Sequence, residues 1–244
     1  MRKVKDLKIK IFADGADLKG ILEMYANPKI KGFTTNPTLM RKAGITDYET
    51  FARELLRKVP DRPVSLEVFA DDFREMEQQA LTIASWGRNV NVKIPISNTK
   101  GEFAGPLIRS LAAKGVVINV TAVTTVKQVE ALAKVLDPAV PAIVSVFAGR
   151  VADTGVDPIP HMRECLKVLK HLPKAELLWA SSRELLNIFQ ANETGCHIIT
   201  ATNDLIAKLN LVGKDLDEYS RETIEMFYRD AVSSKFAISM KASS

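Results

Sequence analysis

Short apolar runs rich in β-branched residues alternate with longer amphipathic segments along this chain. Eight runs have the length and composition of buried strands: residues 8–13, 32–35, 64–69, 90–94, 116–121, 142–147, 177–180 and 197–200. The segments that follow them have apolar residues at helical spacing: residues 18–25, 48–58, 73–86, 103–114, 126–136, 160–171, 183–191 and 204–209. A last amphipathic segment, 216–236, predicts one or two further helices after the alternation ends.

Three predicted helix starts match the capping box, in which Ser or Thr is followed three residues later by Glu or Gln and both side chains satisfy N–H groups of the first turn. They are Thr46-x-x-Glu49, Thr125-x-x-Gln128 and Ser181-x-x-Glu184. We expect a helix to begin at each of these points.

Eight strands that alternate with eight helices in 244 residues predict an α/β fold, a single (β/α)8 barrel. A doubly wound sheet is the alternative, but a nucleotide-binding sheet usually has a Gly-rich turn after its first strand. Here that strand ends Phe12-Ala13-Asp14-Gly15-Ala16, without such a turn. No linker or repeat divides the chain, so we expect one domain over 1–244, with 1–7 as a lead-in and 214–244 as a helical tail.

Alternate side chains of a barrel strand point toward the helices and into the barrel. In the fourth run, Val90, Val92 and Ile94 share one parity, whereas Asn91 and Lys93 share the other. The polar residues that this parity directs inward are Asp14, Thr34, Asn36, Glu67, Asn91, Lys93, Asn119, Thr121 and Ser145. Most of them lie near the carboxyl ends of their strands, where barrel enzymes place their chemistry.

Lys93 is the residue in this set that most needs an explanation. A buried ammonium without a partner is costly, so it either pairs or lowers its pKa, and a neutral lysine attacks carbonyl groups. Asp14 and Glu67 could simply neutralise Lys93 in a buried ion network. Two acids and a lysine at the same end of three different strands favour a functional site instead. Lys93 is therefore a candidate Schiff-base former.

An anion site is a further candidate at the same end of the barrel. Arg150 follows the sixth strand, and Ser181, Ser182 and Arg183 follow the seventh. Each arginine alone is more typical of a surface residue, but two of them beside a helix-starting serine pair match the usual position of a phosphate site in such barrels. The residues by themselves leave both interpretations open.

Charge and composition argue against several other classes. The 34 basic and 29 acidic residues give a net charge of +5 and are interspersed, apart from a short basic cluster in the first ten residues. Because no aromatic residues interleave with basic ones, we expect no nucleic-acid partner. We also expect no membrane segment, because no apolar stretch approaches the length of about 20 residues that a spanning helix needs.

Cysteine usage and the amino terminus indicate a cytoplasmic protein. Cys165 and Cys196 are too few for a disulfide framework, and the first residues contain no apolar signal core. His161 lies four residues before Cys165 and His197 follows Cys196, but neither pair has a third ligand at metal spacing. We therefore expect no metal.

Seven short motifs follow one another at the predicted strand ends. They are Phe12-Ala13-Asp14, Thr34-Thr35-Asn36-Pro37-Thr38, Ser65-Leu66-Glu67-Val68, Asn91-Val92-Lys93-Ile94-Pro95, Asn119-Val120-Thr121, Ser145-Val146-Phe147-Ala148-Gly149-Arg150 and Ala180-Ser181-Ser182-Arg183. Each is a weak signal alone, but in this order they are specific. Over nearly the whole chain the sequence resembles the transaldolase family, especially its short form, which is close to the fructose-6-phosphate aldolases.

This resemblance implies a Schiff-base mechanism without metal or cofactor. Lys93 would attack the ketone of fructose 6-phosphate or sedoheptulose 7-phosphate, and a dihydroxyacetone unit would pass to an aldose phosphate, as in the pentose phosphate pathway. Asp14 would be the general base and acid, and Glu67 and Thr121 would hold a proton-shuttling water. The resemblance further implies dihydroxyacetone contacts from Thr34, Asn36, Asn119 and Ser145, and a phosphate clamp of Arg150, Ser181 and Arg183.

Two positions distinguish transferase from aldolase within this resemblance. Transaldolases have glutamate on the third strand and phenylalanine on the sixth, and this chain has Glu67 and Phe147. The fructose-6-phosphate aldolases have glutamine and tyrosine there, and the tyrosine hydroxyl could help to protonate the enamine and release dihydroxyacetone. We therefore expect a transferase, with an aldolase as the alternative.

Some features depart from the family pattern. Ser182 stands where relatives commonly have a bulky aromatic residue, and the segment after the last strand, Thr200-Ala201-Thr202-Asn203, lacks the expected proline. A different phosphate pocket, and with it another anionic ketose as substrate, is therefore an alternative.

Two further classes of protein compete with this interpretation: a sugar-phosphate-binding barrel without turnover, and a deoxyribose-phosphate-type aldolase. Intact Asp14, Glu67 and Lys93 argue against the first. The second would have another lysine at a strand end, and the fifth to eighth runs contain none. Short-form relatives often form pentamers or decamers through their tail, so we expect a homo-oligomer.

Overall fold

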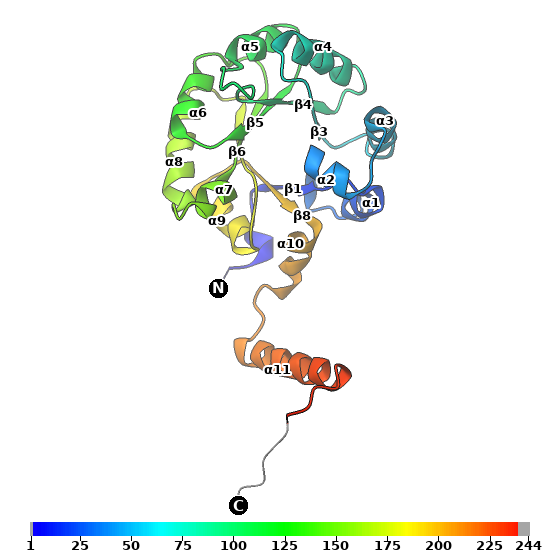
Figure 1. The fold of residues 1–244 in the computed structure, drawn as a ribbon. Helices are drawn as coiled ribbons and strands as arrows, with labels where there is room; N and C mark the ends of the chain where they lie inside the picture. Colours follow the sequence, from blue (N-terminus) through cyan, green and yellow to red (C-terminus); the bar gives the residue numbers. More distant parts are fainter. Residues whose placement is uncertain (1, 239–244) are drawn as a thin grey trace, which may run out of the picture. The chain divides into compact units, whose positions relative to one another are not determined.

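Eight parallel strands close into a barrel in sequence order (Figure 1). The computed structural model describes residues 2–238, so Met1 and 239–244, at the ends of the predicted lead-in and tail, lie outside the described residues. The strands are β1 (Lys10–Asp14), β2 (Ile30–Thr34), β3 (Val64–Glu67), β4 (Val90–Pro95), β5 (Ile118–Val123), β6 (Ala142–Val146), β7 (Ala175–Trp179) and β8 (Ile198–Thr202). Each overlaps one predicted run, and the predicted (β/α)8 barrel is confirmed.

Helices surround the barrel, and further helices follow its last strand in the sequence. They are α1 (Leu18–Tyr25), α2 (Pro37–Lys42), α3 (Tyr48–Lys58), α4 (Phe73–Ala84), α5 (Gly105–Ala113), α6 (Val126–Ala133), α7 (Ala148–Asp153), α8 (Pro158–Leu169), α9 (Leu186–Thr194), α10 (Asn203–Ala207) and α11 (Leu216–Ser233), with 3-10 turns η1 (Val4–Asp6) and η2 (Lys208–Leu211). Helices α2 and α7 were not among the predicted elements. Each has six residues, which is too short for a helical period to emerge.

The three predicted capping boxes have different outcomes. Thr125 and Gln128 form the predicted box at the start of α6. The prediction at Thr46 is wrong, because Asp47 caps α3 and accepts a hydrogen bond from the backbone N–H of Thr50. A carboxylate one residue closer to the first turn reaches the free N–H groups first.

The prediction of a helix start at Ser181 is also wrong, because α9 begins only at Leu186. The loop before it is held from inside the helix instead. The side-chain oxygen of Asn187 accepts hydrogen bonds from the backbone N–H groups of Arg183, at 2.8 Å, and Glu184, at 3.1 Å. This arrangement leaves Ser181 free to face the end of the barrel.

The inner and outer faces of the strands follow the predicted parity. Among inward residues, Phe12 packs with Ile143, Leu178, Ala180 and Ile198 in one buried apolar cluster. A Cβ atom on Gly32 would lie 2.6 Å from the Phe12 ring, so the glycine in β2 provides the space for that ring. The barrel interior is therefore apolar around this cluster, and its polar residues gather at the carboxyl ends of the strands.

The chain divides into two compact units, residues 7–209 with the barrel, and residues 1–6 together with 210–244. The second unit contains α11, which has no buried residue and exposes Leu216, Ile224, Phe227 and Tyr228. One domain over the whole chain stays a prediction. Within residues 2–238, no helix is both long and apolar enough to span a bilayer.

Candidate active site

A cavity of about 400 Å³ opens at the carboxyl ends of the strands. Of the predicted site residues, those that line it are Asp14, Thr34, Asn36, Glu67, Lys93, Thr121, Ser145, Phe147, Arg150 and Ser181. Asn119 and Arg183 are not among the lining residues. Strand parity thus brings most of the predicted set to one cavity.

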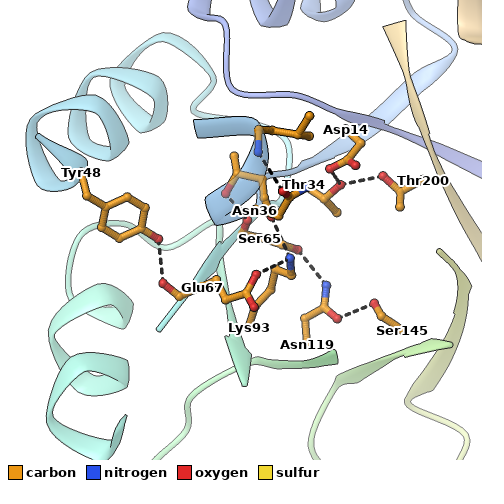
Figure 2. Close-up of polar contacts among 12 residues, drawn as sticks. Asp14, Thr34, Asn36, Tyr48, Ser65, Glu67, Lys93, Asn119, Ser145 and Thr200 are labelled. Carbon is orange, nitrogen blue, oxygen red and sulfur yellow. Dashed lines mark hydrogen bonds and ion pairs between the residues drawn. The ribbon is translucent and has the colours of Figure 1, made fainter. Parts of the chain in front are cut away.

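Lys93 is paired inside the barrel, with 7% of its surface exposed. Its Nζ atom donates hydrogen bonds to Glu67 Oε2, at 2.8 Å, and to the backbone carbonyl of Thr35, at 2.7 Å (Figure 2). The register of β3 against β4 places Glu67 directly beside Lys93. The ammonium of Lys93 is therefore paired, and Glu67 is in position to take a proton from it.

Tyr48 contacts the backbone of Glu67 at the end of β3, whereas Lys93 contacts the Glu67 side chain. Its hydroxyl donates a hydrogen bond to the backbone carbonyl of Glu67 at 3.0 Å (Figure 2). Its ring lies edge-on to Phe69 and Trp86, with centroid separations of 4.5 and 5.7 Å. Burial raises the pKa of the Tyr48 phenol, so this hydroxyl stays protonated and remains a donor. Sequence reasoning missed Tyr48, because the first residue of a surface helix gives no sign of its partner 19 residues later.

Asp14 is the second carboxylate of the cavity and accepts a hydrogen bond from Thr34 Oγ1 at 2.8 Å. Burial raises its pKa, an effect opposed by the Thr34 hydrogen bond, the charge of Lys93 and a hydrogen bond from Asn36, and reinforced by the charge of Glu67. A carboxyl group whose pKa is moved toward neutrality can both accept and return a proton. Asp14 therefore fits general acid–base work.

Asn36 has a second role at the start of α2. Its side-chain oxygen accepts a hydrogen bond from the backbone N–H of Leu39 at 2.9 Å, which caps the helix, and Pro37 occupies the first helical position. Cap and proline together fix where the chain leaves β2. The start of α2 thereby becomes one wall of the cavity, with Pro37, Thr38 and Leu39 lining it.

Asn119 lies behind the cavity and is fully buried. It accepts a hydrogen bond from Ser145 Oγ at 2.6 Å and donates one to Ser65 Oγ at 3.1 Å. The single proton of the Ser145 hydroxyl therefore points toward Asn119, so Ser145 faces the cavity as an acceptor. In this structure Asn119 orients a lining residue and does not line the cavity itself.

Two lining residues have strained backbones. Ala122 has a φ of 59° and Ser181 a φ of 63°, a left-handed region that costs side-chain-bearing residues about 1–2 kcal/mol. Ala122 sits where the β5–β6 register shifts between Val120 and Val123. The irregularity lies next to Thr121 and ends the regular strand at the cavity.

The two predicted phosphate-binding arginines differ in position. Arg150 lines the cavity, and its guanidinium lies 5.8 Å from the centre of the Phe147 ring. Arg183 instead forms a two-pronged ion pair with Asp153 of α7, in which Nε lies 3.1 Å from Oδ1 and Nη2 contacts Oδ2. An incoming anion would have to compete with Asp153 for Arg183.

Close packing joins the start of α7, which carries Arg150, to the loop that carries Arg183. The backbone N–H of Gly149 donates to the carbonyl of Ala180 at 3.3 Å. A Cβ atom on Gly149 would lie 1.6 Å from the backbone oxygen of Ser181, so only glycine fits there. Ser182, which departs from the family pattern, donates a hydrogen bond to the backbone carbonyl of Thr200 at 2.8 Å.

Thr200 is the lining residue that strand parity could have revealed. It shares its parity with Ile198, which packs inside the barrel. The lining residues Ala122, Ala180, Pro37 and Leu39 carry no polar side chain that would mark them as site residues. Pro37, Thr38 and Ala180 were visible only as parts of the motifs that carry the family resemblance.

Residues 2–238 contain no group of three or more His, Cys, Asp or Glu side chains that lie close enough together to bind a metal ion. Cys165 and Cys196 are buried free thiols, and burial raises the pKa of each to about 12. These thiols therefore remain protonated at neutral pH.

The fold and the cavity define a (β/α)8 barrel with a lysine and two carboxylates at the carboxyl ends of its strands. The family model described as transaldolase/fructose-6-phosphate aldolase matches residues 11–239. A "Probable transaldolase" of Dehalococcoides mccartyi is 34% identical over 202 residues, 82% of this chain and 90% of that protein. A "Probable transaldolase 2" of Listeria monocytogenes is also 34% identical over 202 residues, covering 82% of this chain and 88% of its own length.

The chain belongs to the transaldolase/fructose-6-phosphate aldolase family. Among solved structures it is similar to an HpcH/HpaI aldolase/citrate lyase family protein from Burkholderia cenocepacia J2315, with a TM-score of 0.57 and 14% identity over 87% of this chain and 95% of that one. At that identity the likeness concerns the fold alone.

Replacement of Asp14 by asparagine should stabilise the protein at neutral pH. Burial raises the pKa of Asp14, so the native carboxyl keeps its proton to a higher pH than in the unfolded chain, where the proton is lost at about pH 3.9. Stability is therefore lost as the pH rises through the native pKa, and asparagine avoids that loss. Urea denaturation should give Asp14→Asn the larger free energy of unfolding at pH 7, with a smaller advantage at pH 4.

The exposed Asp204 in the first turn of α10 provides the control. Asp204→Asn removes a carboxylate that favours the helix start, so it should not stabilise the protein at either pH. Equal effects of Asp14→Asn at pH 7 and pH 4 would contradict this effect of burial on Asp14.

Proposed function

We propose that this chain is a transaldolase of the pentose phosphate pathway. It transfers a dihydroxyacetone unit from sedoheptulose 7-phosphate or fructose 6-phosphate to glyceraldehyde 3-phosphate or erythrose 4-phosphate through a Schiff base on Lys93. The observation that carries the proposal is the buried Lys93 Nζ, 2.8 Å from Glu67 Oε2, in a cavity that Asp14 also lines. Membership of the family supports it. A cytoplasmic location stays a prediction.

The first half of the reaction forms the Schiff base. Lys93 gives a proton to Glu67, and the neutral amine attacks the C2 carbonyl carbon of the ketose to form a carbinolamine. Loss of the C2 hydroxyl as water gives the iminium, with Glu67 returning the proton. Thr121 lines the cavity with Glu67 and, in this proposal, helps to hold the water that carries these protons.

The second half breaks and remakes a carbon–carbon bond. Asp14 takes the proton of the C4 hydroxyl, the C3–C4 bond breaks, and its electron pair moves into the iminium to give an enamine. The aldose phosphate leaves and the acceptor aldehyde enters. The enamine carbon then attacks the acceptor carbonyl, Asp14 returns its proton to the new alkoxide, and hydrolysis of the iminium frees Lys93.

The remaining side chains would bind the substrate. Thr34, Asn36 and Ser145 line the cavity and offer hydrogen bonds to the dihydroxyacetone hydroxyls, with Asn119 acting through Ser145. Arg150 and Ser181 line it on the side of β6 and β7 and would bind the phosphate. Arg183 would join them by exchanging Asp153 for the substrate anion.

Borohydride reduction tests the Schiff base. Treatment with fructose 6-phosphate should leave a three-carbon adduct on Lys93, seen by peptide mass spectrometry, and Lys93→Ala should abolish both adduct and turnover. Lys10 is the matched control, because its partly exposed Nζ pairs with Glu176 at 2.6 Å outside the cavity. Lys10→Ala should keep the adduct. An adduct that persists in Lys93→Ala, or none in the native protein, would refute the proposal.

Dependence on an acceptor separates transferase from aldolase. With fructose 6-phosphate alone, dihydroxyacetone release should be slow, and erythrose 4-phosphate should restore conversion to sedoheptulose 7-phosphate. Phe147 has no hydroxyl to help protonate the enamine, so Phe147→Tyr should raise acceptor-free release by at least about tenfold. Native release of dihydroxyacetone as fast as transfer would favour the aldolase alternative. Rates with other anionic ketoses then identify the preferred donor.

We further propose that α11 mediates assembly into a pentamer or decamer. Its exposed apolar residues Ile224, Phe227 and Tyr228 lie three and four residues apart, on one helix face. Phe227→Glu should reduce the mass measured by light scattering to that of smaller species. Arg229→Glu also places an acid at an exposed position of α11 and should leave the mass unchanged. A native monomer would exclude the proposal.

A further inference from the structure

Thr200 lies at one end of a short hydrogen-bonded chain that ends on Asp14. Its hydroxyl oxygen is 2.6 Å from Thr34 Oγ1, and Thr34 Oγ1 is 2.8 Å from Asp14 Oδ1. The three residues come from β8, β2 and β1, so the side chains from both neighbours of β1 meet inside the barrel (Figure 2). Only 6% of Thr200 and 4% of Thr34 is exposed.

The direction of this chain follows from counting protons. An ionised carboxylate can only accept, and each hydroxyl has a single proton to donate. Thr34 donates its proton to Asp14. Its contact with Thr200, in which the distance alone leaves the donor open, therefore has Thr200 as the donor. The chain runs from Thr200 through Thr34 to Asp14.

This direction favours the charged form of Asp14. A hydroxyl that accepts a hydrogen bond becomes a better donor, so Thr200 strengthens the bond from Thr34 to the carboxylate. If Oδ1 carried the proton, Thr34 would become the acceptor. The Thr34 proton would then turn toward Thr200, whose own proton would need another partner. Protonation of Oδ1 would therefore break this pattern, and protonation of Oδ2 would leave Oδ1 a weaker, uncharged acceptor, so the chain favours ionised Asp14 in either case.

We propose that Thr200 is a positioning residue which, acting through Thr34, stabilises the ionised form of Asp14 as the general base of the reaction. The inference rests on the role of Asp14 in the proposed function. It assigns a role to a residue of β8 that contacts neither Lys93 Nζ nor the carboxylate of Asp14.

The other groups around Asp14 show why such support matters. Burial raises the pKa of Asp14, and so does the charge of Glu67 from β3, whereas Lys93 from β4 and the amide of Asn36 lower it. From α10, which also packs against β1, the acidic Asp204 is exposed to solvent. The Thr34 hydrogen bond is the largest of the effects that lower the pKa.

The backbone of Thr200 is fixed well enough for this role. It pairs with Phe12 in the register of β1 and β8, and its carbonyl accepts a hydrogen bond from Ser182 Oγ at 2.8 Å. Ser182, at a position where relatives commonly have a bulky aromatic residue, makes this bond with a short side chain. It anchors the strand that carries the first hydroxyl of the chain.

Titration of Asp14 tests the proposal without turnover. The carboxyl of Asp14 is followed by ¹³C NMR in the full-length protein, with Asp14→Asn as the assignment control. Thr200→Val removes the hydroxyl at nearly constant volume and should raise the titration midpoint by about half to one pH unit. Thr200→Ser, which keeps the hydroxyl, should leave the midpoint near its native value.

Thr194 supplies the matched control, because Thr194→Val makes the same chemical change at a residue of α9 that does not line the cavity and whose hydroxyl donates to the backbone carbonyl of Gln190. It should leave the midpoint unchanged. Thr200→Ala and Thr200→Ser form a second pair in case valine disturbs the packing, and alanine should shift the midpoint where serine does not. An unshifted midpoint in both Thr200→Val and Thr200→Ala overturns the inference.

The pH dependence of kcat links the titration to catalysis. Loss of the Thr200 hydroxyl should move the acid limb of the kcat profile upward by the same amount, while KM for the ketose at high pH stays constant. A shifted NMR midpoint in a protein that forms no Lys93 adduct would refute the proposed function alone. An active protein with unshifted profiles would refute the role of Thr200 alone.

Discussion

The ion pair between Lys93 and Glu67 is the interaction on which the rest of the site depends. An ammonium inside a barrel needs a partner, since the loss of hydration is repaid only by a well-placed opposite charge and complete hydrogen bonding. The register of β3 and β4 supplies that partner directly, and the Thr35 carbonyl supplies a second acceptor. Tyr48 then fixes the strand end from which Glu67 extends. The β3–β4 register, the Thr35 carbonyl and Tyr48 thus together position the Nζ atom of Lys93.

Asp14, unlike the Lys93–Glu67 pair, lowers the stability of the folded protein when it is charged. Its burial penalises the charged form, and neighbouring hydroxyl and amide groups offset that penalty only in part. The left-handed backbone of Ala122 and Ser181 is a second local cost at the same cavity. Strain and unfavourable burial concentrated where chemistry takes place are typical of sites that trade stability for function. The apolar cluster around Phe12 and the covered strands of the barrel supply the stability that this cavity lacks.

The sequence predicted the strands better than the ends of the helices. Long periodic segments such as 73–86 emerged clearly, whereas α2 and α7 did not, because six residues give no measurable period. Capping motifs failed where a better acceptor lay nearby, as Asp47 does beside Thr46. Among candidate site residues, parity placed Lys93 correctly, since alternation alone determines which side of a strand a residue faces. It did not place Asn119, which points inward but lies beneath Ser145.

The sequence by itself determined the order of the strands, the face of each strand that turns inward, and the end of the barrel where lysine and carboxylates gather. Those properties depend on local periodicity, which the sequence of each strand and each longer helix carries in itself. Only the tertiary structure decided which groups touch: Glu67 with Lys93, Arg183 with Asp153, and Thr200 with Thr34, a pair 166 residues apart. Such contacts depend on register, rotamers and backbone irregularities that arise when distant segments pack together, and no local pattern encodes them.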